Sequence, residues 1–201
     1  MVYDATGVGR PWVQPGLTSS WIVGGALYRG LGRIDACYGA SSWEDALAWL
    51  CSVEPGQKIE QIQFWGHGKW GSALIAKDVL DASAVLDDRH ARHEDLRTLR
   101  GRLSGREALW WFRTCETFGR EAGHRFATAW ARFFDCRVAG HTYVIGPWQS
   151  GLHSVIPGQV PGWSAREGLP THESEPRYAL MSGPGAPNTI TCLHGRIPAG
   201  F

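Results

Sequence analysis

Two residues that could act as a nucleophile and its base, Cys115 and His67, each follow an apolar stretch of the chain. Large apolar residues fill positions 109–112, and Cys115 comes three positions later. His67 stands between two glycines, directly after a stretch at 59–65 that carries its own apolar residues. Short, bulky runs of this kind are typical of strands buried on both faces of a parallel sheet. We therefore expect both side chains at the ends of core strands.

The chemistry expected of this pair is nucleophilic attack by a thiolate. A cysteine attacks in its ionised form, so it needs either a lowered pKa or a neighbouring base such as an imidazole. A helical pattern at 121–134 follows Cys115, which places the thiol at the edge where open α/β sheets bind ligands. The 48 residues from His67 to Cys115 leave room for a crossover helix between parallel strands. The alternatives are a buried structural cysteine and a histidine hydrogen-bonded in a glycine turn.

The order of apolar strand, His-Gly, about fifty residues, apolar strand and cysteine resembles the caspase-like cysteine peptidases of clan CD. The Cys-Glu-Thr triplet at 115–117, with Gly119 close behind, is most similar to the bacterial CHAT branch, whose cysteine sits in a Ser-Ala-Cys-Glu-Thr-Gly pattern. This chain differs from that pattern in two ways. Arg113 and Thr114 stand in place of Ser-Ala, and Phe118 precedes the glycine.

That resemblance implies a three-layer α/β fold, with a mostly parallel central sheet, helices on both faces and a small hairpin after the histidine. It also implies a thioester intermediate on Cys115 and protonation of the leaving amine by His67. Backbone N–H groups of Gly68 and Cys115 would form the oxyanion hole. The substrate would be a protein or peptide, with no metal and no organic cofactor. Bacterial peptidases of this kind are often tied to defence or regulated cell death.

Arg113 is the most informative departure from the family pattern. Side chains alternate along a strand, so Arg113 is expected on the same side as Cys115. The resemblance places that position in the pocket for the residue before the scissile bond, where an arginine would favour an acidic side chain. The alternative is an arginine that pairs with a nearby carboxylate, Glu116 or Glu121.

Further candidates for the substrate cleft come from two loops. Trp148, Gln149 and Ser150 follow a predicted strand at 137–146, and the resemblance places this loop at a wall of the cleft. Trp148 could hold an apolar residue of the substrate or pack within its loop. Asp35 and Tyr38, near the end of a predicted strand at 33–38, are weaker candidates.

The composition predicts one domain of 201 residues, with no nucleic-acid or membrane partner. The net charge is +1, and the basic residues between 89 and 106 are mixed with acidic ones. No apolar run reaches membrane-spanning length, and no signal peptide is evident. Five cysteines without a CxxC pair indicate free thiols in a reducing compartment, so we expect a cytoplasmic protein. The His and Cys residues lack the spacing of metal ligands.

The remaining elements follow from hydrophobic periodicity and from the positions of Gly and Pro. Alternating strands and helices predict a parallel sheet with helices on both faces. The pattern predicts an N-terminal arm at 1–20, strands at 21–28, 33–38, 59–65, 109–112, 137–146 and 189–193, helices at 43–53, 93–103 and 121–134, a hairpin at 70–79, an ambiguous segment at 79–86, and long loops over the cleft at 147–187.

Two other functional classes stay open beside the peptidase. A catalytically inactive module of the same fold would bind a regulatory protein partner, which the residues that differ from the family pattern permit. A different α/β enzyme, such as an acyl hydrolase, could use Cys115 on small esters.

Overall fold

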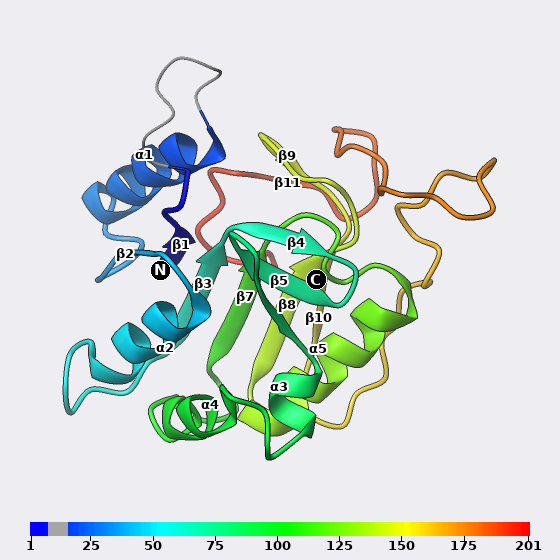
Figure 1. Ribbon diagram of the computed structural model, residues 1–201. Helices are drawn as coiled ribbons and strands as arrows, with labels where there is room; N and C mark the ends of the chain where they lie inside the picture. The colour runs from blue at the N-terminus through cyan, green and yellow to red at the C-terminus, as the bar shows by residue number, and fades with distance from the viewer. Residues whose placement is uncertain (8–15) are drawn as a thin grey trace.

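The computed structural model describes residues 1–7 and 16–201 and is built on a six-stranded central sheet (Figure 1). The strand order is β2-β1-β3-β7-β8-β10. The first five strands are parallel, and β10 pairs antiparallel with β8 at one edge. The prediction of a mixed α/β fold with a mostly parallel sheet is therefore confirmed. The strands are β1 Val2–Asp4, β2 Tyr38–Ala40, β3 Gln61–Trp65, β7 Leu109–Arg113, β8 Arg137–His141 and β10 Leu152–Val155.

Helices cover both faces of this sheet. The larger core lies on the face covered by α2, α4 and α5, and α1 lies on the other face (Figure 1). The start of α2 is stabilised by its own sequence, because the Ser42 side chain accepts a hydrogen bond from the Asp45 backbone N–H, and Glu44 and Asp45 occupy the first turn. The helices are α1 Leu17–Gly30, α2 Trp43–Ser52, α3 Ser83–Leu86, α4 His93–Arg100 and α5 Arg120–Phe134.

Side-chain alternation along β7 divides its residues between the two faces. Trp110 and Phe112 pack into the large core below α5. Trp111 and Arg113 point to the opposite face and are also buried. The apolar run at 109–112 therefore forms a strand buried on both sides, as predicted.

An extended segment completes the second face where a helix is missing. We call residues 190–201 the strap. It begins with β11, Ile190–Thr191, which pairs antiparallel with β9, Trp148–Gln149. Ile190, Ile197 and Phe201 of the strap pack in a cluster with Trp111. Figure 1 shows this red segment running behind the central strands.

A small antiparallel sheet follows β3. It consists of β4 His67–Lys69, β5 Ser72–Ile75 and β6 Asp78–Asp81. The hairpin expected after the histidine is therefore present. The ambiguous segment at 79–86 is divided between the end of β6 and α3.

Two predictions near the N-terminus are wrong. Residues 2–4 form β1 in the interior of the sheet, between β2 and β3, and not part of a surface arm. The arm prediction at 8–15 lies outside the described residues. Residues 21–28 belong to α1 and not to a strand, because β1 already fills the sheet position and the chain must cross over to β2. The apolar run at 21–28 is typical of a buried strand, but in α1 part of this run is in contact with solvent, and Val23 is 67% exposed.

Other boundaries also differ from the predictions. The strand predicted at 33–38 is a connection, and β2 begins only at Tyr38. The segment predicted as loops at 147–187 contains β9 and the edge strand β10. The strand predicted at 189–193 shortens to β11, which pairs with β9 and not with the central sheet. Within residues 1–7 and 16–201, no helix combines the length and apolar character needed to cross a bilayer.

The large core predicts a strong effect of Trp130→Ala. Trp130 is fully buried and packs against Phe126, Trp110 and Phe112. Removing its ring should lower the free energy of unfolding by about 3–5 kcal/mol, measured by chemical denaturation. The matched control is Trp148→Ala, because Trp148 is 42% exposed, and its cost should stay below about 1 kcal/mol. Equal costs for the two variants would contradict this description of the core.

Candidate functional site

The parallel pairing of β3 with β7 brings His67 and Cys115 to the same edge of the sheet. Trp65 is aligned with Arg113 at the carboxyl end of this pair. His67 and Cys115 each lie two residues beyond these aligned positions. Both residues therefore emerge where the two neighbouring strands end, which is the ligand-binding edge of an open α/β sheet.

Gly68 touches the turn that carries the cysteine. A Cβ atom added to Gly68 would lie 2.5 Å from the Cys115 carbonyl oxygen and 2.2 Å from Thr117 Oγ1. The two backbones are thus in direct contact, and only glycine fits at this position. The structure brings together Gly68 and Cys115, the two residues expected to supply oxyanion donors.

The Cys115 thiol is not activated in this conformation. It is partly buried, and its Sγ lies 3.9 Å from the Ile145 carbonyl oxygen. Burial raises the pKa of the Cys115 thiol above its ordinary value; the nearby Glu116 carboxylate raises this pKa further, whereas Lys69 lowers it. Since the thiolate is the nucleophile, ionisation requires a base or a changed environment.

The His67 side chain is exposed and leans toward α1. Its ring meets the Trp21 ring edge-on, with 5.4 Å between the ring centroids. Among the described residues, no hydrogen bond joins the His67 ring to the Cys115 sulfur. A rotation of the exposed imidazole would be needed to bring it into hydrogen-bonding contact with the thiol.

The turn after Cys115 is held firmly in place. Glu116 has a positive φ of 45°, and its backbone N–H donates to the Tyr143 carbonyl at 2.8 Å. Phe118, the residue that precedes Gly119, is fully buried and stacks on Trp163. The Trp163 indole N–H donates to the Phe118 carbonyl at 3.0 Å. Phe118 therefore anchors the loop shape after the cysteine.

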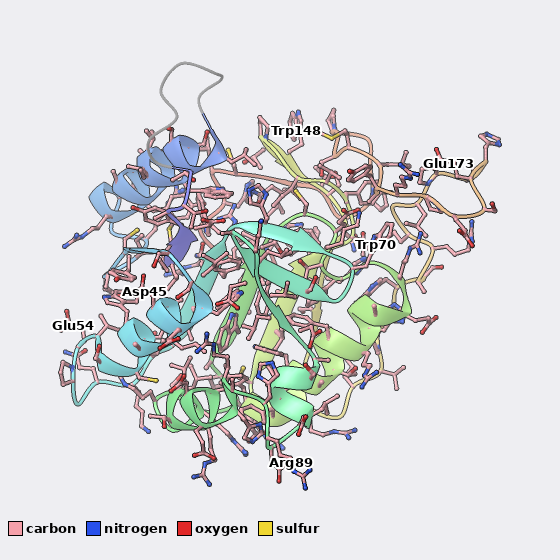
Figure 2. All side chains as sticks on the ribbon, in the orientation of Figure 1. Asp45, Glu54, Trp70, Arg89, Trp148 and Glu173 are labelled. Carbon is pink, nitrogen blue, oxygen red and sulfur yellow. The ribbon has the colours of Figure 1, made fainter. Side chains whose placement is uncertain are left out.

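Glu116 pairs with Lys69 and not with Arg113. Its carboxylate lies 2.7 Å from Lys69 Nζ and accepts the Ala179 backbone N–H at 2.6 Å. The Lys69 ammonium also lies over the Trp70 ring, at 3.9 Å from its centroid. Trp70, labelled in Figure 2, lies in the β4–β5 turn, and the Lys69 ammonium also lies over the ring of Tyr178, the residue before Ala179, at 4.4 Å from its centroid. These contacts connect the loop that contains Ala179 to the Cys115 turn.

Arg113 is buried on the face covered by α1 and the strap, with 2% of its surface exposed. Its Nε and Nη2 donate to Gln149 Oε1 at 3.1 and 2.7 Å. Its Nη1 donates to the Tyr28 hydroxyl at 2.8 Å and to Gln63 Oε1 at 3.4 Å. Two carbonyl oxygens of the strap complete the set of acceptors. The guanidinium is therefore surrounded by uncharged oxygen atoms.

Three aromatic rings enclose the same guanidinium. Its central carbon lies 4.4 Å from the Trp111 ring centroid, 4.7 Å from that of Trp65 and 5.6 Å from that of Tyr28. Burial lowers the pKa of Arg113, but an arginine stays charged in proteins. Within the described chain, no carboxylate lies within 4.0 Å of it, so the expected alternative of a pairing with Glu116 or Glu121 is not seen. A buried cation without a counter-ion is costly, and the rings recover part of that cost.

The other residues predicted to line the cleft lie in different environments. Gln149 contacts Arg113. Trp148, the residue before Gln149, is exposed (Figure 2). Ser150 is fully buried and bonds to Thr189 and Gly183, so it does not line a cleft. The prediction for Asp35 is wrong.

Asp35 lies at the wrong end of the strands to reach the thiol. It precedes β2, and β2 runs parallel to β3 with Tyr38 level with Phe64. Asp35, three residues before Tyr38, therefore lies near the amino end of the strands, where it lines a cavity with Met1 and Gln61, opposite the edge of Cys115. Tyr38 is level with Phe64 in the carboxyl half of β3, and its ring stacks on Trp49 of α2. The prediction failed because Asp35 was expected near the end of a strand at 33–38, whereas β2 begins only at Tyr38.

Two residues at the Arg113 site escaped the sequence analysis, Tyr28 and Gln63. Gln63 alternates with Ile62 and Phe64 along β3 and so points to the face of Arg113, a signal that was available in the strand pattern. Tyr28 is contributed by α1, which was predicted as a strand, and no local pattern indicates its contact.

No protein family model, curated protein or solved structure matches this chain. In the part of the chain that the structure describes, no group of three or more His, Cys, Asp and Glu side chains gathers in a way that could hold a metal ion. A functional proposal therefore rests on the geometry of the residues.

The contact at Gly68 predicts that Gly68→Ala distorts the site. The added methyl group would meet the Cys115 carbonyl and the Thr117 hydroxyl, so the turn must shift. We expect a loss of about 1–3 kcal/mol in the free energy of unfolding, measured by denaturant titration. Gly162→Ala is the control, because an added Cβ there meets no atom within 4 Å. An unchanged stability of Gly68→Ala would refute the close approach.

The environment of the thiol predicts slow alkylation and a dependence on Lys69. Because burial and Glu116 disfavour the thiolate, alkylation of Cys115 by iodoacetamide should reach half its maximal rate at a pH above the ordinary value for cysteine. Lys69→Met removes a positive charge and leaves Glu116 without its partner, so labelling at pH 8 should slow by about threefold or more. Lys77→Met, at an exposed lysine, should leave the rate unchanged. Peptide mass spectrometry measures the rates, and faster labelling of Lys69→Met would contradict this account.

Proposed function

We propose that this chain is a caspase-like cysteine peptidase that hydrolyses peptide bonds through Cys115 and His67. The observation that carries the proposal is the alignment of β3 with β7, which brings both residues to the same sheet edge. The mostly parallel sheet, the helices on both faces and the small antiparallel sheet after His67 support a caspase-like fold. The contact between Gly68 and Cys115 supports an oxyanion hole made from their backbone N–H groups.

In the proposed reaction His67 takes the thiol proton of Cys115. The sulfur then attacks the carbonyl carbon of the scissile bond, and the carbonyl π electrons move to the oxygen. Donation from Gly68 N–H and Cys115 N–H stabilises this oxyanion, an effect worth about 3–4 kcal/mol for one donor in other enzymes. The exposure of the imidazole leaves it free to turn from Trp21 toward the thiol.

The intermediate collapses when the C–N bond breaks and His67 protonates the leaving amine. A thioester between the substrate acyl group and Cys115 Sγ remains. Water, deprotonated by His67, attacks this thioester and releases a carboxylic acid, and the thiol regains its proton. All proton transfers use one imidazole, which matches a dyad without a third orienting residue.

The residue before the scissile bond would be acidic. Arg113 projects from the strand that carries Cys115, its positive charge has no carboxylate partner among the described residues, and Gln149 lies beside it. A carboxylate fits such a guanidinium because two N–H groups can donate to its two oxygens. The proposed substrates are therefore proteins or peptides with Asp or Glu at that residue.

A panel of fluorogenic peptides that differ only in the residue before the cleaved bond tests this function. We expect turnover of the Asp or Glu peptide to exceed that of the Leu and Arg peptides, and Cys115→Ala or His67→Ala to reduce kcat/KM by at least about a thousandfold. His172→Ala, in an exposed loop, is the control and should keep full activity. Activity that survives Cys115→Ala would refute the mechanism, and equal turnover across the panel would refute the preference.

A catalytically inactive, protein-binding module is the second candidate. The raised pKa of Cys115 and the missing hydrogen bond to His67 within the described residues are the observations that favour it. No turnover of any peptide, together with a rate of Cys115 alkylation that His67→Ala leaves unchanged, would support the module over the enzyme.

A further inference from the structure

The strap reaches the same guanidinium that the proposed substrate would use. Arg113 Nη1 donates to the His194 carbonyl at 3.0 Å, and its Nη2 donates to the Cys192 carbonyl at 3.2 Å. The Tyr28 hydroxyl lies 2.7 and 2.8 Å from these two oxygens. Gln63 Nε2 donates to the next strap carbonyl, that of Gly195, at 3.4 Å. Two backbone oxygens therefore occupy the positions that the two oxygens of a carboxylate could take.

We propose that the strap closes a carboxylate-binding pocket formed by Arg113, Tyr28, Gln63 and Gln149, and that an acidic side chain of a peptide displaces it. The acidic peptide as ligand rests on the proposed function; the closure of the pocket rests on the contacts of the strap alone. In this closed form the carbonyls of Cys192 and His194 hold the guanidinium and keep a substrate side chain from it.

The chemistry of the pocket favours a carboxylate over the carbonyls. Charged acceptors bind a guanidinium more strongly than neutral ones, and a planar carboxylate can accept two parallel N–H bonds. The walls are the rings of Trp65 and Trp111, which exclude water and so strengthen such a pair. The pocket holds a positive charge with no negative partner among the described residues, and an acidic side chain would supply that partner.

The strap is built in a way that allows it to leave. Its pairing with β9 covers only two residues, and beyond Thr191 it forms no helix or strand. Leu193, between the two carbonyl contacts, is 56% exposed. A cavity of about 1110 Å³ lies beside it, with Arg33, His194 and Gly195 in its lining. The short pairing and the open space on one side mark residues 192–196 as the part of the strap with low local stability, whereas Ile197 and Phe201 stay packed in the cluster with Trp111.

Ligand binding and opening of the strap are linked equilibria, so the opening can be tested by adding a ligand to the whole chain. A ligand that binds only the open pocket must raise the population of the open form. The Cys192 backbone N–H donates to the Pro147 carbonyl at 2.8 Å in the closed form, and it becomes free to exchange when the strap leaves. Hydrogen–deuterium exchange of residues 190–196 therefore reports the displacement without any turnover.

The experiment uses Cys115→Ala protein, so that no peptide is cleaved, and the probes acetyl-Ala-Ala-Glu-amide and acetyl-Ala-Ala-Gln-amide. The Glu peptide at saturating concentration should increase exchange at 190–196 at least fivefold, and the Gln peptide should not. Arg113→Gln should abolish this response. Unchanged exchange with the Glu peptide, or an equal response to both peptides, would overturn the proposal.

A pair of strap variants provides an independent measurement. Ile190 is buried against Trp111, so Ile190→Ser should loosen the strap and tighten binding of the Glu peptide at least tenfold by calorimetry. Leu193→Ser makes a similar change at an exposed strap residue and should leave the affinity unchanged. Equal affinities of Ile190→Ser and the parent protein would refute closure.

The outcomes separate this inference from the proposed function. Binding of the Glu peptide with strap displacement, but no turnover by the protein that retains Cys115, would support the closed pocket and refute the peptidase. Turnover of Glu peptides while exchange of the strap stays unchanged would refute the closed pocket and support the peptidase.

Discussion

The parallel pairing of β3 with β7 is the constraint on which the candidate site depends. One register, with Trp65 level with Arg113, sets the positions of His67 and Cys115 beyond the strand ends and of Arg113 just below them. A one-residue slip would turn Arg113 into the large core, because side chains alternate along a strand. The fully buried rings of Trp110 and Phe112 on the other face hold this register, since they fit only in the apolar layer under α5.

Arg113 links that strand pair to the rest of the molecule. Its contacts come from β3, α1, β9 and the strap, and these segments are far apart in the sequence. The charge needs all of these acceptors because burial removes its hydration. The resulting arrangement is an ordered core contact, and in the proposed pocket the same guanidinium would bind a carboxylate in place of carbonyl groups. The order of this part of the core and the proposed recognition of an acidic side chain thus depend on the same guanidinium.

The elements that the sequence predicted well are those with strong local patterns. The helix predicted at 121–134 appears as α5 because one face carries large apolar residues at helical spacing, and the run at 109–112 appears as β7. The run at 21–28 failed because a short apolar segment has the same composition in a buried strand and in a partly exposed helix. Residues 2–4 were missed because three residues are too few to show a period, although the sheet places them in its interior.

The sequence by itself determined which chemistry is available and where it lies along the chain. Cys115 and His67 follow apolar strands, and this is a local property that spacing and residue type express. Only the tertiary structure decided what surrounds Arg113. Its contacts with Tyr28 and with the strap join residues 85 and 81 positions apart, and no periodic pattern encodes such pairs. They form because the buried charge must find acceptors, and those acceptors exist only when the sheet, α1 and the strap have come together.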